Sequence, residues 1–246
     1  MPPGAVFSAL WQNGEMTFPT PKNLDHITDW VFDLDNTLYP RECNLFAQID
    51  VRITHYVMDV TKLDFDAART LQKSYYRDFG TTLNGLMHRH AIDPDHFLHT
   101  VHAIDYTPVD AHPALIEAIR ALPGRKFILT NGDTSHARSV LGRLGDADLF
   151  EDVYDIRAMT YVPKPHREAY DGFLLRHGID PRRAAMFDDL EKNLVVPHEI
   201  GMSTVQVVAG EGFAHEQVEA WELGQSTGPH VHHVTGDLAG FLRNLR

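Results

Sequence analysis

The sequence contains only one cysteine, Cys43, among its 246 residues. A single thiol excludes an intrachain disulfide and a cysteine-rich zinc site. Proteins of oxidising compartments at this size commonly use disulfides, so the composition favours a reducing environment. We therefore expect the protein to be cytoplasmic.

Clustered positive charge is also missing. The net charge is −12 at pH 7, and no block of Lys and Arg interrupts the acidic background. Binding to a nucleic-acid backbone depends on clustered cations, so we exclude nucleic acid as a main partner. Because the overall field repels anions, an anionic substrate would need a few local positive charges or a metal ion.

Long hydrophobic runs are absent as well. The first 16 residues lack the positively charged start of a signal peptide, and no stretch is long enough to span a bilayer. We therefore expect no membrane association. The hydrophobic content of 43% is instead typical of a globular protein with a sizeable core. A monomer and a homodimer remain equally open.

Strand-like and helical patterns alternate through most of the chain. Five apolar runs read as strands, at 29–35, 126–130, 152–156, 184–188 and 204–208. Helical periodicity lies between the later runs, at 113–122, 134–144, 165–177 and 190–200. Such alternation predicts βαβ units and an α/β fold with a Rossmann-like parallel-sheet core.

A helical segment at 42–106 interrupts this alternation after the first strand. Its apolar residues recur every three or four positions, a second helix is expected around 66–79, and IDPDHF reads as a helix start at Asp93. The sequence therefore predicts an N-terminal extension at 1–28 and a core formed by 29–41 and 107–246. The segment 42–106 would be an inserted helical domain.

Polar residues follow three of the predicted strands. Ligands of an open parallel sheet bind where its strands end, so these residues are expected to meet in one place. Clustered carboxylates are the ligands that Mg²⁺ prefers, and a carboxylate can also attack phosphorus if a metal ion and a lysine offset the charge repulsion. The residues concerned are Asp33, Asp35, Thr130, Asn131, Asp188 and Asp189, together with Lys164 between two prolines.

The motifs DLDNT, TNGD, PKP and FDDLEKN occur in this order, and together they resemble the haloacid dehalogenase superfamily of phosphohydrolases. The resemblance runs from about residue 30 to the C-terminus. DLDNTLYP, YYRDFGTTLNGLMHRHAID and TNGDTSHARSVLGRLG further resemble the pyrimidine 5′-nucleotidase branch. The chain departs from that branch at Phe79, where Tyr is usual, and at Pro197, which should kink or break its helix.

The resemblance implies a role for each core motif. Asp33 would be the nucleophile and a Mg²⁺ ligand, and Asp35 would be the general acid/base whose backbone carbonyl also reaches the metal. Asp189 would bind the metal directly, and Asp188 directly or through water. The phosphoryl group would be held by the backbone N–H of Leu34 and by Thr130, Asn131 and Lys164, with Thr37 and Asn193 in support.

The inserted helices resemble the cap that closes over the active site in this superfamily, and lids of this kind complete a specificity pocket. The glycine-containing turn FGTTLNG is expected to reach the leaving group of the substrate. The candidate specificity residues in and after this turn are Thr81, Thr82, Gly85 and His88.

The implied activity is that of a Mg²⁺-dependent phosphomonoesterase that forms an aspartyl-phosphate. The expected substrates are small phosphorylated metabolites, foremost pyrimidine nucleoside 5′-monophosphates such as UMP and CMP. Alternatives are a phosphatase for a sugar phosphate, phosphoglycolate or pyridoxal phosphate, a phosphomutase, and a non-catalytic phospholigand-binding protein. A dehalogenase is disfavoured because it does not need Asp35. An EF-hand is excluded because Leu38 and Asn44 replace its glycine and glutamate.

The remaining candidates have structural interpretations. PHVHHV, with His230, His232 and His233, is expected to form a surface strand or loop, because no nearby carboxylate or cysteine completes a metal site. Tyr75 and Tyr76 are expected to pack within the inserted helices. The sequence leaves open whether His88, His90, Arg77 and His136 lie at the site.

Overall fold

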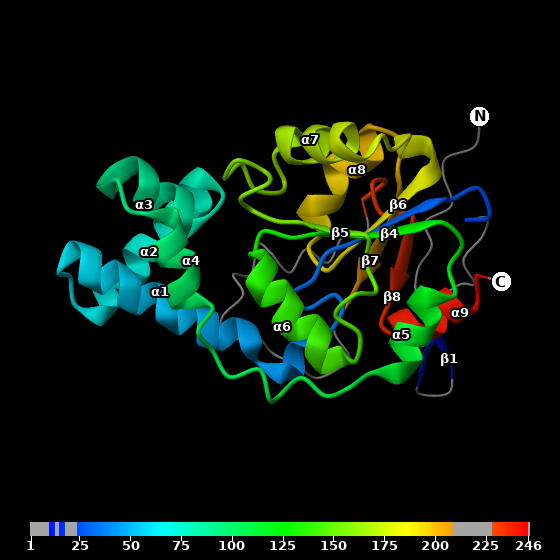
Figure 1. The fold of residues 1–246 in the computed structure, drawn as a ribbon, viewed down its shortest axis with the longest axis horizontal. Helices are drawn as coiled ribbons and strands as arrows, with labels where there is room; N and C mark the ends of the chain where they lie inside the picture. The colour runs from blue at the N-terminus through cyan, green and yellow to red at the C-terminus, as the bar shows by residue number, and fades with distance from the viewer. Residues whose placement is uncertain (1–9, 13–14, 18–23, 209–227, 246) are drawn as a thin grey trace.

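A six-stranded parallel sheet forms the centre of the computed structural model, which describes residues 10–12, 15–17, 24–208 and 228–245 (Figure 1). The strand order is β5-β4-β3-β6-β7-β8. This arrangement confirms the predicted α/β fold with a parallel sheet. The strands are β3 (Asp29–Phe32), β4 (Arg125–Leu129), β5 (Asp152–Tyr154), β6 (Ala184–Asp188), β7 (Ser203–Val207) and β8 (His233–Thr235).

Helices cover both faces of the sheet (Figure 1). Helices α5 (Pro113–Arg120), α6 (Thr134–Leu144) and α9 (Leu238–Arg243) lie on one face, and α7 (Arg167–His177) and α8 (Val195–Glu199) lie on the other. Successive side chains of a strand point to opposite faces, so Trp30 and Phe32 join one hydrophobic core and Val31 joins the other. The continuous apolar runs of the strands follow from burial on both faces.

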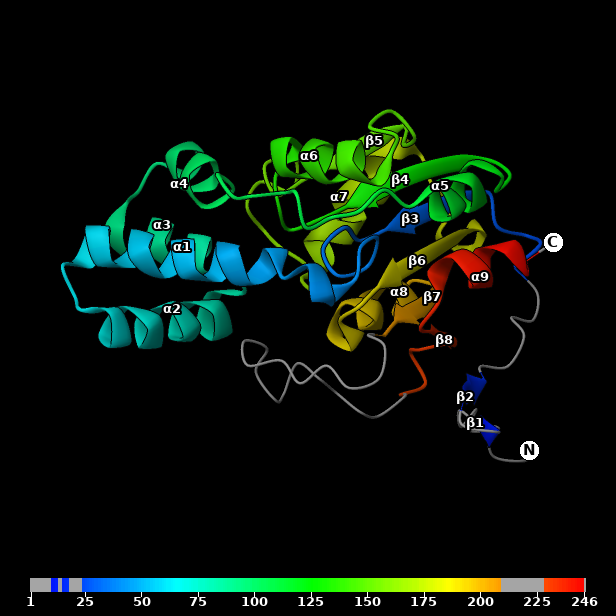
Figure 2. The same ribbon diagram turned by 90° about the horizontal axis from the view of Figure 1, so that it is seen from below.

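Four helices follow β3 and lie to one side of the sheet (Figure 2). They are α1 (Leu45–Thr61), α2 (Phe65–Phe79), α3 (Thr82–His90) and α4 (Pro94–Val101), and we call them the insertion helices. The expected helix around 66–79 and the expected helix start at Asp93, whose side chain accepts from the Asp95 N–H, are both confirmed. The division of the chain into domains stays a prediction.

Two local expectations differ from the structure, and the surface strand or loop expected for PHVHHV is confirmed in part by β8. The predicted turn ends earlier than expected, because the Thr81 hydroxyl accepts from the Asn84 N–H and α3 begins at Thr82. Residues 233–235 form the edge strand β8, parallel to β7. Within the predicted irregular extension at 1–28, β1 (Leu10–Gln12) pairs with β2 (Glu15–Thr17), whereas residues 1–9, 13–14 and 18–23 lie outside the described residues.

Pro197 does interrupt a long helix, as expected. The segment consists of a 3-10 helix, Glu191–Leu194, followed by the short helix α8. Pro197 is the third residue of α8, where a backbone N–H would have no acceptor within the helix. In the described part of the chain, no helix is long and apolar enough to cross a bilayer.

Candidate active site

Three carboxylates meet where two neighbouring strands end. β3 and β6 run parallel with Phe32 level with Phe187, so Asp33 and Asp188 follow at the same height. Together with Asp189, these residues offer carboxylate oxygens that all lie within 4.8 Å of one another. All three side chains are buried. The pairing of β3 with β6 thus brings together the carboxylates that the sequence predicted at one edge of the sheet.

Lys164 lies between two of these carboxylates. Its Nζ donates to Asp33 Oδ1 and to Asp188 Oδ2, each at 2.7 Å, and its side chain is only 1% exposed. Burial alone would lower the pKa of Lys164, but the charges of Asp188 and Asp33 outweigh burial and hold that pKa above its usual value. The ammonium group is therefore a permanent positive charge in the site.

The carboxylate cluster nevertheless carries excess negative charge. Burial, with the charges of Asp188, Asp189 and Asp35, raises the pKa of Asp33 well above its usual value although Lys164 opposes the shift. Burial and the charge of Asp188 likewise raise the pKa of Asp189 to about 7, against the opposing effects of Arg41 and Lys164. These shifts indicate a site that would be stabilised by another cation.

The residues present fit a magnesium ion. The donors are carboxylate oxygens, which suit a hard divalent cation. Asn193 donates from Nδ2 to Asp188 Oδ1 at 2.9 Å, while its buried Oδ1 has no hydrogen-bond donor. An orphaned acceptor beside the carboxylates suits a water molecule of a hydrated metal ion. Asp33, Asp188 and Asp189 are therefore the residues that would hold the metal.

The predicted phosphate-binding residues take two different roles. Thr130 follows β4, is buried, and accepts the Gly132 N–H at its Oγ1 at 3.0 Å, which leaves the hydroxyl hydrogen able to donate to a phosphoryl oxygen. Asn131 instead binds the backbone of Lys164, since Oδ1 accepts its N–H at 2.9 Å and Nδ2 donates to its carbonyl at 3.1 Å. Asn131 therefore positions Lys164, a role that the sequence did not predict.

The supporting roles of the first motif are visible in its contacts. The Thr37 hydroxyl donates to Asp33 Oδ2 at 3.2 Å. The Leu34 side chain is fully buried in the core, so only its backbone faces the site. The Thr37 hydrogen bond and the buried Leu34 side chain thus hold the loop between β3 and α1 next to Asp33.

Asp35 is bound by two donors. Its Oδ1 accepts from the Tyr39 hydroxyl at 2.6 Å and lies 2.7 Å from His136 Nε2. Burial would raise the pKa of Asp35, but the charge and hydrogen bond of His136, with the Tyr39 hydrogen bond, lower it to about 2. Asp35 is therefore an ionised carboxylate at neutral pH when no substrate is bound.

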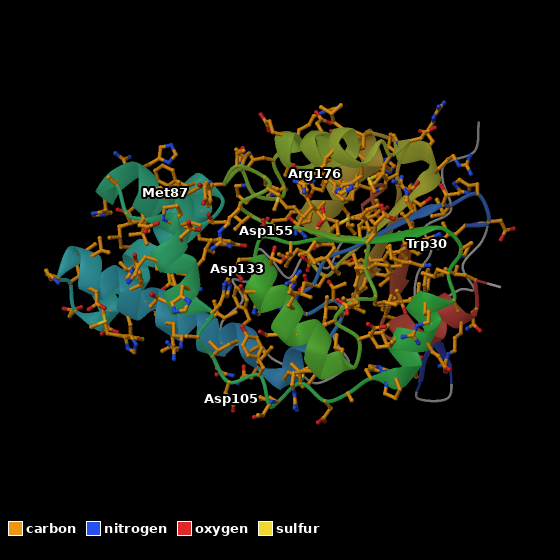
Figure 3. All side chains as sticks on the ribbon, viewed as in Figure 1. Trp30, Met87, Asp105, Asp133, Asp155 and Arg176 are labelled. Carbon is orange, nitrogen blue, oxygen red and sulfur yellow. The ribbon has the colours of Figure 1, made fainter. Side chains whose placement is uncertain are left out.

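His136 connects Asp35 to the insertion helices. Its ring is fully buried and stacks on His102, which follows α4, with 4.6 Å between ring centroids. Asp133 caps α6 by accepting the His136 N–H at 2.8 Å, and Arg157 Nη1 lies 3.3 Å from Asp133 Oδ2. Figure 3 places Asp133 at the side of the core that faces the insertion helices.

Replacing Asp133 by Asn should test this network through pH. Burial would raise the pKa of Asp133, but His102, the His136 N–H and Arg157 outweigh burial and hold it below its usual value of 3.8. A lowered folded pKa contributes stability above the unfolded pKa, and that contribution disappears as the pH falls below it. Asn can still cap the helix, so we expect a loss of about 1–2 kcal/mol at pH 7.

The loss should shrink as the pH falls below about 3.8, where the unfolded carboxyl becomes protonated. Urea unfolding of the wild type and of Asp133→Asn at pH 7 and pH 3 measures both differences. The exposed Asp148→Asn is the matched control and should behave like the wild type. An equal loss at both pH values would contradict the assignment.

A cavity of about 200 Å³ extends from the carboxylates to the insertion helices. The core lines it with Asp33, Asp35, Thr130, Asn131 and Lys164. The insertion helices line it with apolar side chains, among them Phe46, Ile49, Ile53, Phe97, Leu98 and Val101, and with the polar side chains of Asp50, Gln72, Lys73, Thr82 and Thr81, the N-cap residue of α3. The cavity therefore suits a substrate with one anionic end and a second end that carries both apolar and polar groups.

The four candidate specificity residues separate into two pairs. Thr81 and Thr82 line the cavity. Gly85 and His88 are not among its lining residues: Gly85 packs against Tyr75, where an added Cβ would lie 2.4 Å from that side chain, and His88 is exposed. Both belong to α3, whose first residue, Thr82, does line the cavity, so contact of Gly85 and His88 with a substrate stays a prediction.

For other side chains, the positions predicted from the sequence agree less well with the structure. Tyr75 is buried against Phe79, as expected, but Tyr76 lines the cavity, and its hydroxyl accepts from Lys192 Nζ at 2.8 Å. Arg77 is exposed and pairs with Asp78, and His90 contacts the Tyr75 hydroxyl. The sequence also missed Arg41, Tyr39 and His102. The position of Arg41 directly after DLDNTLYP was the only signal for it.

The histidines near the C-terminus have more partners than the sequence indicated. His230 Nε2 lies 2.9 Å from Glu191 Oε1, which corrects the expectation that no carboxylate is nearby. His232 Nε2 lies 3.1 Å from His198 Nδ1, and His232 Nδ1 accepts the Thr204 N–H. These contacts join the segment before β8 to the 3-10 helix Glu191–Leu194, to α8 and to β7.

The family model of haloacid dehalogenase-like hydrolases matches residues 31–194, about two thirds of the chain. The match contains all the carboxylates, the lysine and the insertion helices described above. The chain belongs to the haloacid dehalogenase-like hydrolase family. Hydrolysis is therefore its class of reaction.

This haloacid dehalogenase-like hydrolase is similar to a yeast protein and to several solved structures. Phosphate metabolism protein 8 of Saccharomyces cerevisiae is 27% identical over 191 residues, which are 71% of this chain and 59% of the yeast protein. The chain thus spans less than two thirds of that relative.

The solved structures show the fold. A haloacid dehalogenase-like hydrolase of Streptococcus pneumoniae has a TM-score of 0.55 at 17% identity, covering 90% of this chain and 99% of that chain. An L-2-haloacid dehalogenase of Xanthobacter autotrophicus has a TM-score of 0.54 at 16% identity, covering 89% and 98%. A phosphatase of the family from Thermococcus onnurineus has a TM-score of 0.51 at 18% identity, covering 77% and 90%.

Proposed function

We propose that this haloacid dehalogenase-like hydrolase is a Mg²⁺-dependent phosphomonoesterase that acts on small phosphorylated metabolites. The observation that supports it most is the placement of Lys164 between Asp33 and Asp188, with Asp35 held close by. A lysine that screens a carboxylate nucleophile favours attack on a dianionic phosphate. The yeast relative is named for phosphate metabolism, which agrees with the proposal.

In the first half of the reaction, Asp33 attacks phosphorus and the bond to the leaving oxygen breaks. Lys164 and Thr130 hold the phosphoryl oxygens while negative charge develops on them. When substrate binds, Asp35 takes up a proton from solvent, because the phosphate dianion raises its pKa by like-charge repulsion, and it then gives that proton to the leaving oxygen. The product of this step is a phosphorylated Asp33 and a free alcohol.

In the second half, Asp35 takes a proton from water as the water attacks phosphorus. The bond between Asp33 and phosphorus then breaks, and inorganic phosphate leaves. When bound at Asp33, Asp188 and Asp189, Mg²⁺ supplies positive charge that offsets the repulsion between carboxylates and phosphate. The hydrogen bonds of Asp35 to Tyr39 and His136 hold it in position for both proton transfers.

Asp35 also separates this proposal from haloacid dehalogenation. A halide leaves without a proton, whereas an alkoxide leaving group needs one. The dehalogenase of Xanthobacter autotrophicus shares the fold at 16% identity, so dehalogenation is the second candidate. The motifs typical of the pyrimidine 5′-nucleotidase branch and the mixture of apolar and polar side chains that the insertion helices present to the cavity favour UMP and CMP as substrates.

A substrate panel with and without Mg²⁺ tests the proposal. We expect phosphate release from UMP or CMP that falls at least about 100-fold when EDTA removes the metal. Sugar phosphates, phosphoglycolate, pyridoxal phosphate and phenyl phosphate test the alternative esters, and 2-chloropropionate tests dehalogenation. Halide release without phosphate release would overturn the proposal, and an isomerised sugar phosphate would indicate a mutase.

A further inference from the structure

Arg41 is a buried cation with unused hydrogen-bond donors. It begins the 3-10 helix Arg41–Cys43, which connects the loop after β3 to α1, and its side chain is 8% exposed. Its Nη2 pairs with Asp189 Oδ2, but its Nε and Nη1 are buried and have no acceptor. Burying charged donors without partners is unfavourable, so the arrangement indicates an acceptor that arrives with a ligand.

The cavity provides the place for that acceptor. Arg41 lines it together with the carboxylates. Lys164 and Thr130 already supply donors for a phosphoryl group there. Arg41 lies instead on the segment that joins the core to the insertion helices, shortly before Phe46 and Ile49 of α1, which line the same cavity. A substrate would place the first atoms of its leaving group in this region.

We propose that Arg41 is a substrate-binding residue whose Nε and Nη1 donate to oxygen acceptors of the leaving group next to the phosphate ester. The inference rests on the proposed phosphomonoesterase activity and names its substrate class. The leaving group is a polyol or nucleoside with hydroxyl or carbonyl oxygens close to the ester, rather than a hydrocarbon or a plain aryl group. A guanidinium group suits this task because its rigid planar donors keep fixed directions while one edge holds Asp189.

A purely structural role for Arg41 makes a different prediction. If the side chain only neutralised Asp189, its loss would affect every substrate and the metal equally. If Arg41 bound the phosphoryl group, its loss would weaken the binding of inorganic phosphate. Only contact with the leaving group makes the effect depend on the chemistry of the leaving group.

Steady-state kinetics of Arg41→Lys and Arg41→Met with two esters separates these roles. Loss of the Asp189 counter-charge should affect both esters alike, so the role of Arg41 is read from the difference between them: kcat/KM for UMP should fall about 10-fold to 100-fold more than kcat/KM for phenyl phosphate, whose leaving group has no further acceptor. Arg52→Met is the matched control on α1, since Arg52 is exposed and does not line the cavity, and it should leave both esters unchanged.

Calorimetric binding of uridine and of inorganic phosphate provides a readout that does not need turnover. We expect both Arg41 variants to lose at least about 10-fold more affinity for uridine than for inorganic phosphate. Equal losses for the two esters, equal losses for uridine and phosphate, or no binding of uridine by the wild type would overturn the inference. If the wild type binds uridine but hydrolyses neither ester, the proposed function is wrong. The binding data then still test whether Arg41 binds the leaving group.

Discussion

Replacing Asp33 by Asn is expected to reduce phosphate release at least about 1,000-fold, because the amide cannot form the phosphorylated intermediate. The same change should leave the fold intact. Asn has nearly the shape of Asp: its side-chain oxygen can still accept from Lys164, and its NH2 group can donate to the Thr37 hydroxyl oxygen. Single-turnover assays with UMP would measure the loss of the first chemical step directly.

The stability of Asp33→Asn should move in the opposite direction to its activity. In metal-free buffer, burial and neighbouring carboxylates disfavour the charge on Asp33, so its removal relieves repulsion. The free energy of unfolding in EDTA should therefore equal or exceed that of the wild type. Added Mg²⁺ should stabilise the wild type more than the variant, because the variant has lost one ligand.

Asp29→Asn is the matched control at the other end of the same strand. Asp29 pairs with Arg125 Nη2 at 2.6 Å, far from the carboxylate cluster, so this variant should lose stability and keep its activity. A metal-free Asp33→Asn that unfolds as readily as Asp29→Asn would contradict the view that the nucleophile is held at a cost in stability. Undiminished turnover would exclude Asp33 as the nucleophile.

Lys164→Met should damage both activity and stability. Turnover should fall about 1,000-fold, because a buried positive charge no longer stabilises the developing negative charge on the phosphoryl oxygens. The free energy of unfolding in metal-free buffer should fall by about 3–5 kcal/mol, since Asp33 and Asp188 lose the cation between them. Urea unfolding and phosphate release measure the two effects separately.

Lys126→Met is the control for this substitution. Lys126 is a half-buried lysine on β4 whose Nζ donates to the Gly124 carbonyl, outside the site, so it should change stability little and activity not at all. A Lys164→Met variant as stable as this control would show that the cluster tolerates the missing cation. The proposed neutralising role of Lys164 would then be wrong.

The sequence predicted the sheet and the carboxylate cluster for a simple physical reason. Parallel strands buried on both faces read as continuous apolar runs, and their carboxyl ends meet at one edge. Polar residues placed directly after three such runs, at Asp33, Thr130 and Asp188, therefore had to converge. The register of β3 and β6 then set the height at which they meet.

The residues around this cluster were harder to predict because their contacts depend on tertiary packing. His136 lies on α6 and His102 follows α4, and their stacking arises only when the insertion helices return to the core. Arg41 reads as a surface residue after a proline, and only burial of the loop turns it toward Asp189. Two glycines near Thr81 suggested a long turn, although Gly85 serves close packing of α3 on Tyr75.

The contact of Arg157 with Asp95 has a consequence for how the molecule responds to its solvent. Arg157 Nε reaches Asp95 Oδ1 on α4 at 2.6 Å, and the two side chains are 37% and 66% exposed. Exposed ion pairs weaken at high ionic strength, whereas buried pairs such as Lys164 with Asp188 are screened much less. Salt should therefore weaken this contact between α4 and the core before it affects the reacting groups, so that this contact and the chemistry of the site respond to different ionic strengths.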